Sequence, residues 1–380
     1  MKIIHTADLH LDSRMNRHFD DAKAAQRKNE LLSTFQNIVH YAVSNGVDAI
    51  LIAGDLFDTR SITATARDAV ISAVVNNPGI TFFYLRGNHD AGSFLNDFRE
   101  RIHGNLPENL KLFGETWTTY PFRGSDGTEV LITGAEVTKD NNSALEASLA
   151  LNQAKMNIVM LHGQEADSAG GHDVGSDFAV IPIRAYRNRG IDYLALGHIH
   201  QPKIAQLDAR GTYSYCGCPE GRGFDEIGPR GFNLLTIEDG HLDVRFVPFA
   251  QRIIYDISVD VSTSLTNDDA IALIREEMEN AGILAKDLVK VRLVGETELD
   301  VHFDKAYIAH ILNDTYYLVR VKDGTRPRID YDKFAADMSL KGEYVRMVKA
   351  AADRDELSES EASEMIALGI RLLSGEERLS

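Results

Sequence analysis

The chain has 380 residues and a mass of 42.1 kDa, a length at which roughly two or three domains are expected. Apolar residues make up 44% of the sequence and charged residues 26%, and these values exclude a disordered, collagen-like or coiled-coil chain. The 40 basic and 57 acidic residues give a net charge of −17, so composition alone disfavours a nucleic acid as the partner.

The two cysteines and the N-terminal residues indicate the compartment. Cys216 and Cys218 are separated by one residue, which is too close for a standard disulfide, and two cysteines are too few for a zinc site. Asp8 lies where a signal peptide needs its apolar segment, and the sequence has no apolar run of about 18 residues. We therefore expect a cytoplasmic protein with no membrane partner.

Short apolar runs alternate with helical periods in the first part of the chain, which predicts β-α-β units and an α/β fold. Strands are predicted at residues 2–6, 49–53, 80–85, 156–161 and 193–196. Helices are predicted at residues 20–45, before Gly46, and at residues 63–77, before Pro78 and Gly79.

The pattern changes near Phe249. Strands predicted at residues 253–261, 289–294 and 301–303, with a helix at 268–280, indicate a small α+β domain. From Tyr331 the sequence turns helical, with helices predicted at 334–352 and 361–373 around a polar break. We predict three parts: a first domain at 1–250, an α+β domain at 251–330, and a helix-loop-helix tail at 331–380.

Acidic, amide and imidazole side chains follow five of the predicted strands. The motifs are Asp8-Leu9-His10, Gly54-Asp55-Leu56-Phe57-Asp58, Gly87-Asn88-His89-Asp90, His162-Gly163 and Gly197-His198-Ile199-His200. Open α/β sheets place their ligand sites at the carboxyl ends of strands, so we expect these side chains to meet. This mixture of donors without a thiolate suits manganese or iron, and zinc less exclusively, and two ions satisfy it more easily than one.

Each of these motifs is common by chance when it stands alone, whereas the ordered set of five predicts a metal site. Histidines outside the set need no such role. We expect His5, inside the first strand, and His172, in a glycine-rich loop, not to be ligands.

The five motifs resemble those of the calcineurin-like metallophosphoesterase superfamily over about residues 1–250. The resemblance implies a β-sandwich flanked by helices that holds two divalent ions. It implies that Asp8, His10 and His200 bind one ion, that Asn88, His162 and His198 bind the other, and that Asp55 bridges both. It also implies that His89 contacts the scissile phosphate and protonates the leaving oxygen, and that Asp58 orients His89.

Two divalent ions at such a site lower the pKa of a bridging water, so that hydroxide can attack phosphorus near neutral pH. The ions also add a local charge of about +4, which answers the objection raised by the acidic composition.

Further residues resemble the SbcD-type DNA repair exonucleases. They are Ile4 to Asp12, the Gly54 to Asp58 block, and Tyr215 to Glu220 followed by Phe224-Asp225-Glu226, while Gly221-Arg222 and Arg230-Gly231 are more like the YhaO-type subgroup. Thr59 after Asp58, and Asp90 at the end of the third motif, count against the protein phosphatases of the superfamily. Gly163 after His162 departs from the nuclease branch, and we find no basic stripe or aromatic run that predicts a DNA platform.

The leading hypothesis is a manganese-dependent DNA exonuclease and endonuclease, the nuclease subunit of a double-strand-break processing complex. By resemblance, 251–330 would be a capping domain, the tail would dock on an SbcC-like coiled-coil ATPase, and the first domain would form a homodimer. Iron, zinc, magnesium and nickel are alternative ions. Arg222 and Arg230 are candidate contacts for DNA phosphates, with a solvated arginine face as the alternative.

Two other functions remain open from the sequence: a stand-alone phosphatase or nucleotide phosphodiesterase, and a non-catalytic metal-bound scaffold subunit. For the tail, the alternative to an ATPase partner is packing on its own domain or on a second copy.

Overall fold

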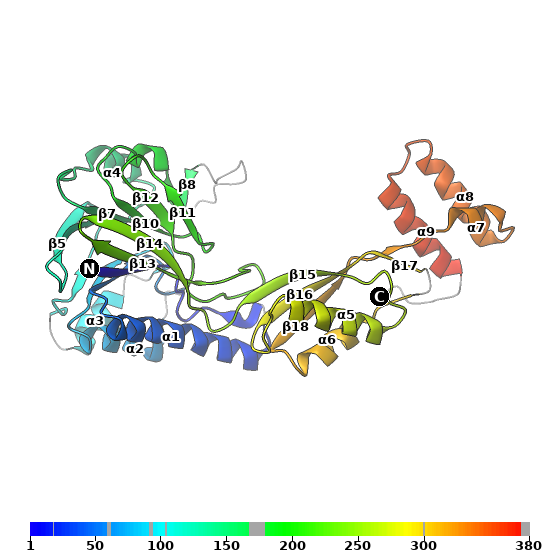
Figure 1. The fold of residues 1–380 in the computed structure, drawn as a ribbon, viewed down its shortest axis with the longest axis horizontal. Coiled ribbons are helices and arrows are strands. Elements are labelled where there is room, and N and C mark those ends of the chain that lie inside the picture. Colours follow the sequence, from blue (N-terminus) through cyan, green and yellow to red (C-terminus); the bar gives the residue numbers. More distant parts are fainter. Residues whose placement is uncertain are drawn as a thin grey trace. The chain divides into compact units, whose positions relative to one another are not determined.

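The computed structural model of the chain (Figure 1) describes residues 1–17, 19–58, 62–90, 94–102, 105–166, 179–298 and 301–373. It divides into two compact units, Met1–Ile253 and Ile254–Ser380. Thr59, His172 and the tail residues 374–380 lie outside the described residues.

Two six-stranded sheets lie face to face in the first unit. The first sheet has the order β14 (His241–Pro248), β13 (Gly231–Glu238), β1 (Lys2–Thr6), β2 (Ala49–Ala53), β3 (Thr81–Leu85) and β4 (Leu110–Leu112). The second has the order β11 (Lys203–Gln206), β12 (Thr212–Tyr215), β10 (Tyr193–Gly197), β7 (Asn157–His162), β6 (Glu129–Gly134) and β5 (Thr118–Arg123). β1 to β4 are parallel, as are β12, β10, β7 and β6, and the remaining strands pair antiparallel.

Helices cover the outer face of each sheet. α1 (Asp21–Ser44), α2 (Ala64–Val75) and α3 (Phe94–Arg101) lie on the first sheet (Figure 1), and α4 (Asn142–Ser148) and the 3-10 helix η3 (Ile183–Tyr186) lie on the second. Short elements complete the unit: the 3-10 helix η1 (Met15–Arg17) and the strand pair β8 (Gln164–Glu165) and β9 (Val180–Ile181). The predicted α/β class and helix-flanked β-sandwich are therefore confirmed.

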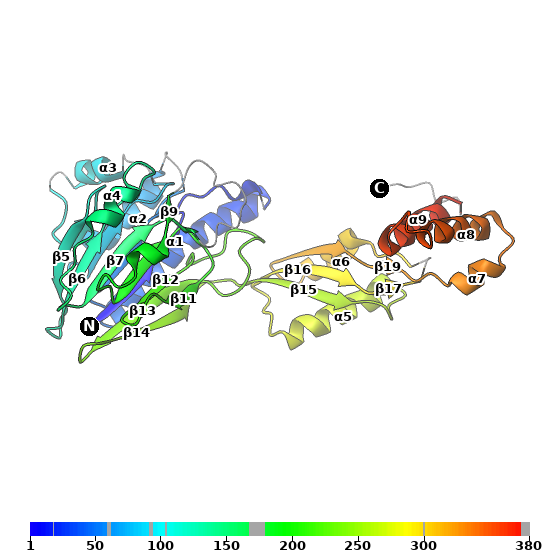
Figure 2. The same cartoon turned by 90° about the horizontal axis from the view of Figure 1, so that it is seen from above.

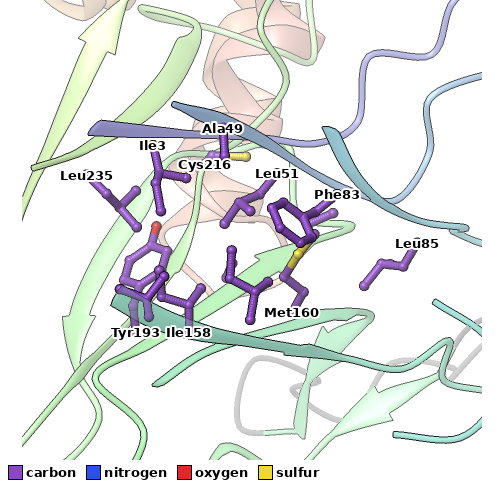
Figure 3. Packing of buried hydrophobic residues seen from close by; sticks show 14 of the residues in the cluster. Ile3, Ala49, Leu51, Phe83, Leu85, Ile158, Met160, Tyr193, Cys216 and Leu235 are labelled. Carbon is purple, nitrogen blue, oxygen red and sulfur yellow. The ribbon is translucent and has the colours of Figure 1, made fainter. Parts of the chain in front are cut away.

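The main core fills the space between the two sheets. Figure 3 shows Leu51 and Phe83 of the first sheet facing Ile158 and Met160 of the second. All four side chains are at most 1% exposed. Because both faces of the central strands are covered, by helices outside and by the other sheet inside, these strands are continuous apolar runs, which is why the sequence located them well.

Helix α1 shows how local sequence sets the element boundaries. The Asp20 carboxylate accepts a hydrogen bond from Lys23 N at 2.8 Å and caps the first turn. Phe35 and Ile38 are buried against the sheet, and Gly46, with a φ of +62°, ends the helical segment in the left-handed region. The predicted and observed helices differ here by one residue at each end.

A buried ionic network joins α1 to two distant segments of the first unit. Fully buried Arg27 donates hydrogen bonds to Glu30 and, at 2.9 Å, to Glu220 Oε1. Arg252 Nη2 donates to Glu30 Oε1 at 2.7 Å, and Gln251 N donates to Glu220 Oε2 at 2.7 Å. The network thereby connects α1, the loop after β12 and the last residues of the unit.

The second unit is built on a parallel sheet of β15 (Ile254–Asp260), β16 (Leu288–Val294) and β18 (Leu318–Asp323). Helices α5 (Asn267–Asn280) and α6 (Lys305–Asn313) pack on one of its faces, and a short pair is formed by β17 (Glu296–Thr297) and β19 (Arg326–Pro327). The strand predicted at 301–303 is wrong: these residues form no strand, and Asp304 directly after them caps α6 by accepting hydrogen bonds from Ala306 N and Tyr307 N. Strand β18 was not predicted.

Three helices follow: α7 (Tyr331–Ala336), α8 (Leu340–Ala352) and α9 (Glu359–Leu373). α8 and α9 lie side by side (Figure 2), and Tyr344 Oη donates a hydrogen bond to Met365 O at 2.8 Å. The single helix predicted at 334–352 is wrong, because the chain breaks at Asp337. Ser339 is the N-cap of α8 there, and its hydroxyl accepts a hydrogen bond from Gly342 N. Among the described residues, no helix is both long enough and apolar enough to span a membrane.

Candidate metal centre

The loops after β1 and β2 run side by side beyond the ends of their strands. Asp8 N donates a hydrogen bond to Gly54 O at 3.1 Å, and His10 N donates to Asp55 O at 3.0 Å. Asp8, His10 and Asp55 have φ values of 53°, 45° and 50°, in the left-handed region. Such conformations cost on the order of 1 kcal/mol or more for a residue other than glycine, and they cluster at functional sites. The conformations aim the predicted ligands toward one place.

Glycines in the motifs make room for this convergence. A Cβ atom on Gly54 would lie 2.1 Å from His162 Nδ1, and a Cβ on Gly87 would lie 2.1 Å from Asp55 Oδ1. No real side chain tolerates such contacts. Glycine is therefore required at both positions if the predicted ligands are to keep their places.

The seven predicted ligands form two adjacent groups of donor atoms. Asp8, His10 and His200 offer ligand atoms within 4.8 Å of one another, and so do Asp55, His162 and His198. Nε2 of His10 and Nε2 of His200 are 3.1 Å apart. Asn88 Oδ1 lies 3.1 Å from His162 Nε2, which places the amide at the second group.

Asp55 lies between the two groups. Its Oδ2 is 3.7 Å from His10 Nε2 and 3.4 Å from His162 Nε2, so a single carboxylate oxygen faces one histidine of each group. The other oxygen, Oδ1, accepts a hydrogen bond from His89 N at 2.9 Å. The donor set of carboxylates, imidazoles and one amide fits two divalent ions that share Asp55.

Hydrogen bonds hold three of the imidazoles in one orientation. Nδ1 of His162 is 2.8 Å from Ala53 O, Nδ1 of His200 is 2.6 Å from Glu226 Oε1, and Nδ1 of His10 is 3.1 Å from Asp58 Oδ1. With the proton on Nδ1, each ring presents the lone pair of Nε2 to the centre, as a metal-ligating histidine requires.

His89 and Asp58 form a pair at the edge of the centre. His89 Nδ1 lies 3.2 Å from Asp58 Oδ1, and 46% of the His89 side chain is exposed. The hydrogen bond with Asp58 outweighs burial and raises the pKa of His89. Burial opposes ionisation of Asp58, but hydrogen bonds from His10, His89 and Ser13 hold its pKa well below the usual range. The pair therefore keeps a proton on an accessible imidazole.

Two histidines of the second donor group have opposite pKa shifts. Burial disfavours the charged form of His162, but the carboxylate of Asp55 raises its pKa to about 9. Burial lowers the pKa of His198 to about 4, with the neighbouring charge of His162 acting in the same direction. A cation is therefore favoured next to Asp55, either as a proton on His162 or as a bound ion.

Two acidic residues support the centre and were not predicted to do so. The buried Glu226 orients His200, and although burial opposes its ionisation, the hydrogen bond from His200 lowers its pKa. Asp90 accepts hydrogen bonds from Phe57 N at 2.8 Å and Gly87 N at 2.9 Å, which ties the loops after β2 and β3 together. Burial raises the pKa of Asp90 to about 7. Position directly after the Gly-Asn-His motif is the only sequence signal for Asp90.

The two arginines expected at DNA phosphates are engaged within the protein. Arg222 Nη2 donates to Glu226 Oε1 at 3.0 Å, and its Nη1 lies 3.7 Å from Asp58 Oδ1. Arg230 is 2% exposed, and its guanidinium donates to the backbone carbonyls of His200 and, at 2.9 Å, of Ile227. The expectation that Arg230 contacts DNA is thus corrected: the residue holds the loop that follows His200.

His5 occupies the interior of the sandwich, away from the donor groups. Its Nδ1 lies 2.8 Å from Tyr193 Oη, and burial lowers its pKa to about 3. Two cavities flank the centre. One, of about 480 Å³, is lined by Arg86, Asn88, Lys139 and His162 among others, and the other, of about 750 Å³, by Ser13, Arg14, Asp58 and Arg222 among others.

Comparisons with known proteins agree with this geometry. A family model described as calcineurin-like phosphoesterase matches residues 1–202, more than half of the chain. The chain is 27% identical over 303 residues to the DNA double-strand break repair protein Mre11 of Haloferax volcanii, covering 78% of the chain and 62% of that relative. It is 28% identical over 256 residues to the uncharacterized metallophosphoesterase YhaO of Bacillus subtilis, covering 65% and 60%. It is 27% identical over 275 residues to the SbcD component of the nuclease SbcCD of Escherichia coli, covering 64% and 66%. The matches thus span less than two thirds of each relative.

Proposed function

We propose that this chain, which belongs to the calcineurin-like phosphoesterase family and is a metal-dependent hydrolase of phosphoesters, acts on DNA as a manganese-dependent exonuclease and endonuclease. The observation that carries the proposal is the position of Asp55, whose Oδ2 faces a histidine of each donor group while His89 lies at the edge of the same centre. The printed names of two relatives, a double-strand break repair protein and a nuclease component, support DNA as the substrate.

We assign Asp8, His10 and His200 to one ion, Asn88, His162 and His198 to the other, and Asp55 to both. Two divalent ions bound there supply Lewis acid for the phosphoryl oxygens and lower the pKa of a water that becomes the nucleophile. The protein holds the unprotonated Nε2 atoms toward that place through the contacts of Nδ1 with Ala53 O, Glu226 and Asp58.

His89 holds the proton that the reaction needs on the side of the leaving group. Its Nδ1 faces Asp58, so Nε2 is the atom that donates a proton to the departing oxygen. The raised pKa of His89, caused first by the hydrogen bond with Asp58, keeps this proton in place at neutral pH.

The remaining parts of the chain receive roles by the same proposal. Residues 1–250 form the nuclease domain, which pairs with a second copy, and 251–330 form a capping domain. The tail, 331–380, docks on a coiled-coil ATPase of the SbcC type. Exposed apolar residues on α8 and α9 support this role, since Met347, Leu368 and Leu372 are 62%, 44% and 54% exposed.

The test is the release of nucleotides from linear double-stranded and single-stranded DNA in Mn²⁺, with Mg²⁺, Zn²⁺, Fe²⁺ and Ni²⁺ for comparison. Asp55→Ala and His89→Ala should abolish cleavage, and His40→Ala, an exposed histidine of α1, should not change it. A chromogenic phosphodiester is assayed beside the DNA. Cleavage of the small ester alone, with and without a coiled-coil ATPase, would contradict the nuclease.

A nucleotide phosphodiesterase or phosphatase is the second candidate. The cavity of about 480 Å³ beside Asn88 and His162 favours it, because Arg86 and Lys139 on its wall offer positive charge next to the donor groups. Hydrolysis of a free nucleotide, competing with the chromogenic ester, would select this function over the first.

A further inference from the structure

The sheet of the second unit has two different faces. Val259, Val291 and Val319 lie on the face that packs against α5 and α6 (Figure 1). Successive residues of a strand point to opposite faces, so the residues between them lie on the face away from the helices. The register places Lys290 beside Arg320, and Arg292 beside Lys322, on that second face.

Positive charge therefore gathers on one side of a short sheet. Arg292, Arg320 and Lys322 are exposed, and Lys290 is partly buried. Two acidic residues of β15 share the face: Asp256, whose Oδ2 accepts a hydrogen bond from Lys290 Nζ at 2.5 Å, and Asp260 at the end of the strand, whose carboxylate accepts hydrogen bonds from Ser262. The acidic residues thus belong to the edge strand β15, while β16 and β18 carry the positive charge.

The helix on the other side of the sheet has the opposite charge. α5 carries Asp268, Asp269, Glu276, Glu277 and Glu279 against the one basic residue Arg275. The α+β part of the second unit is therefore acidic on the α5 side and basic on the open face of the sheet. This separation occurs in a chain whose net charge is −17.

The basic pairs have a cost that the fold itself does not explain. Like charges directly opposite each other on neighbouring strands destabilise a sheet. Lys290 beside Arg320 and Arg292 beside Lys322 are two such pairs in consecutive positions. An anion bound over the four side chains would remove the repulsion and turn the cost into affinity.

We propose that Lys290, Arg292, Arg320 and Lys322, here termed the basic sheet face, bind the phosphate backbone of a nucleic acid. The inference rests on the proposed function and adds to it a surface away from the metal centre. Neighbouring strands are about 4.8 Å apart and alternate residues about 6.6 Å apart, while phosphates of one DNA strand recur about every 3.4 Å along a duplex axis. The basic sheet face is thus large enough for about two successive phosphates. It reads no base, because phosphate contacts are independent of sequence.

The test measures binding of a fluorescent DNA duplex to the full chain in EDTA, which prevents cleavage, over a series of salt concentrations. The variant R292Q/K322Q should bind about tenfold more weakly at low salt, and the slope of log K against log salt should fall by about 1.8, because about 0.9 is lost per phosphate contact. R275Q, which removes an exposed arginine on the α5 side, should keep the affinity and slope of the unmodified chain. R292K/K322R, which retains both charges, should restore binding.

Unchanged affinity and slope in R292Q/K322Q, or no DNA binding by the unmodified chain, would overturn the inference. Hydrolysis of the chromogenic phosphodiester should be the same in R292Q/K322Q and the unmodified chain, which excludes damage to the metal centre. Failure of the proposed nuclease is seen separately, as the absence of metal-dependent DNA cleavage by the unmodified chain.

Discussion

Glu226 Oε1 accepts a hydrogen bond of 2.6 Å from His200 Nδ1, and this contact decides which nitrogen of the imidazole faces Asp8 and His10. Twenty-six residues separate the two partners in the chain. Arg222 completes the arrangement by donating to the same carboxylate at 3.0 Å, which holds Glu226 in place. The metal centre therefore depends on a loop that contributes none of its predicted ligands.

Replacing Glu226 by Gln should weaken metal binding. The amide can still accept the hydrogen bond, but it lacks the negative charge that makes His200 a better donor and pairs with Arg222. Loss of such an outer partner typically costs about 10–100-fold in metal affinity. Isothermal titration of the metal-free protein with Mn²⁺ measures the change. Asp225→Asn, at the exposed neighbouring position, should bind Mn²⁺ as the unmodified chain does, and equal affinities in all three proteins would refute the role of Glu226.

Replacing Asp58 by Asn should change the pH dependence of hydrolysis. The hydrogen bond with Asp58 is the main cause that raises the pKa of His89. An acid catalyst must be protonated, so the rate falls as pH rises through its pKa. With Asn at position 58 the pKa of His89 drops, and the alkaline limb of the rate profile should move to lower pH. The profile is measured on the chromogenic phosphodiester, with metal content checked because Asp58 also contacts His10. An alkaline limb that stays in place would assign the titration to another group.

Replacing Gly87 by Ala should damage the centre without unfolding the protein. The added Cβ would lie 2.1 Å from Asp55 Oδ1, so the carboxylate between the two donor groups has to move. A displacement of about 1 Å at a catalytic group can cost about 100-fold in rate. Gly79→Ala is the matched control, because a Cβ there meets no atom within 4 Å. The two variants are compared by activity and by circular dichroism, and full activity in Gly87→Ala would show that the Asp55 position is not critical.

Replacing Arg27 by Met should destabilise the first unit strongly. The substitution leaves Glu220 buried without its guanidinium partner, and removing one member of a buried ion pair costs about 3–5 kcal/mol. Lys23→Met, on the exposed side of the same helix, should change the free energy of unfolding by less than about 1 kcal/mol. Denaturant titration of both variants measures the difference. A loss near that of Lys23→Met would mean that solvent or another side chain compensates Glu220.

Sequence reasoning located what depends on local pattern. Strands 2–6 and 49–53 match β1 and β2 residue for residue, because their apolar runs lie between polar turns. The strand ends then brought the seven predicted ligands together, since carboxyl ends of parallel strands meet at one edge.

What the sequence did not provide depends on contacts between distant residues. Nothing in the local pattern distinguishes Glu226, which orients His200, from the exposed Asp225 beside it. The basic residues of β16 and β18 are likewise inconspicuous in sequence, and only the strand register makes neighbours of Arg292 and Lys322. The break before α8 was missed for a different reason, because Asp337 and Ser339 are also tolerated inside a helix, and their role as caps follows only from the backbone.

The buried network around Arg27 has a consequence for where the first unit can be cut. Gln251 and Arg252 supply hydrogen bonds to Glu220 and Glu30, so they belong to the charge balance of a helix more than 200 residues earlier in the chain. A fragment ending at residue 250 would keep all strands of both sheets but leave two buried carboxylates short of donors. Extending it by two residues restores the donors. The smallest stable fragment is therefore set by electroneutrality of the interior rather than by the last residue of the last strand.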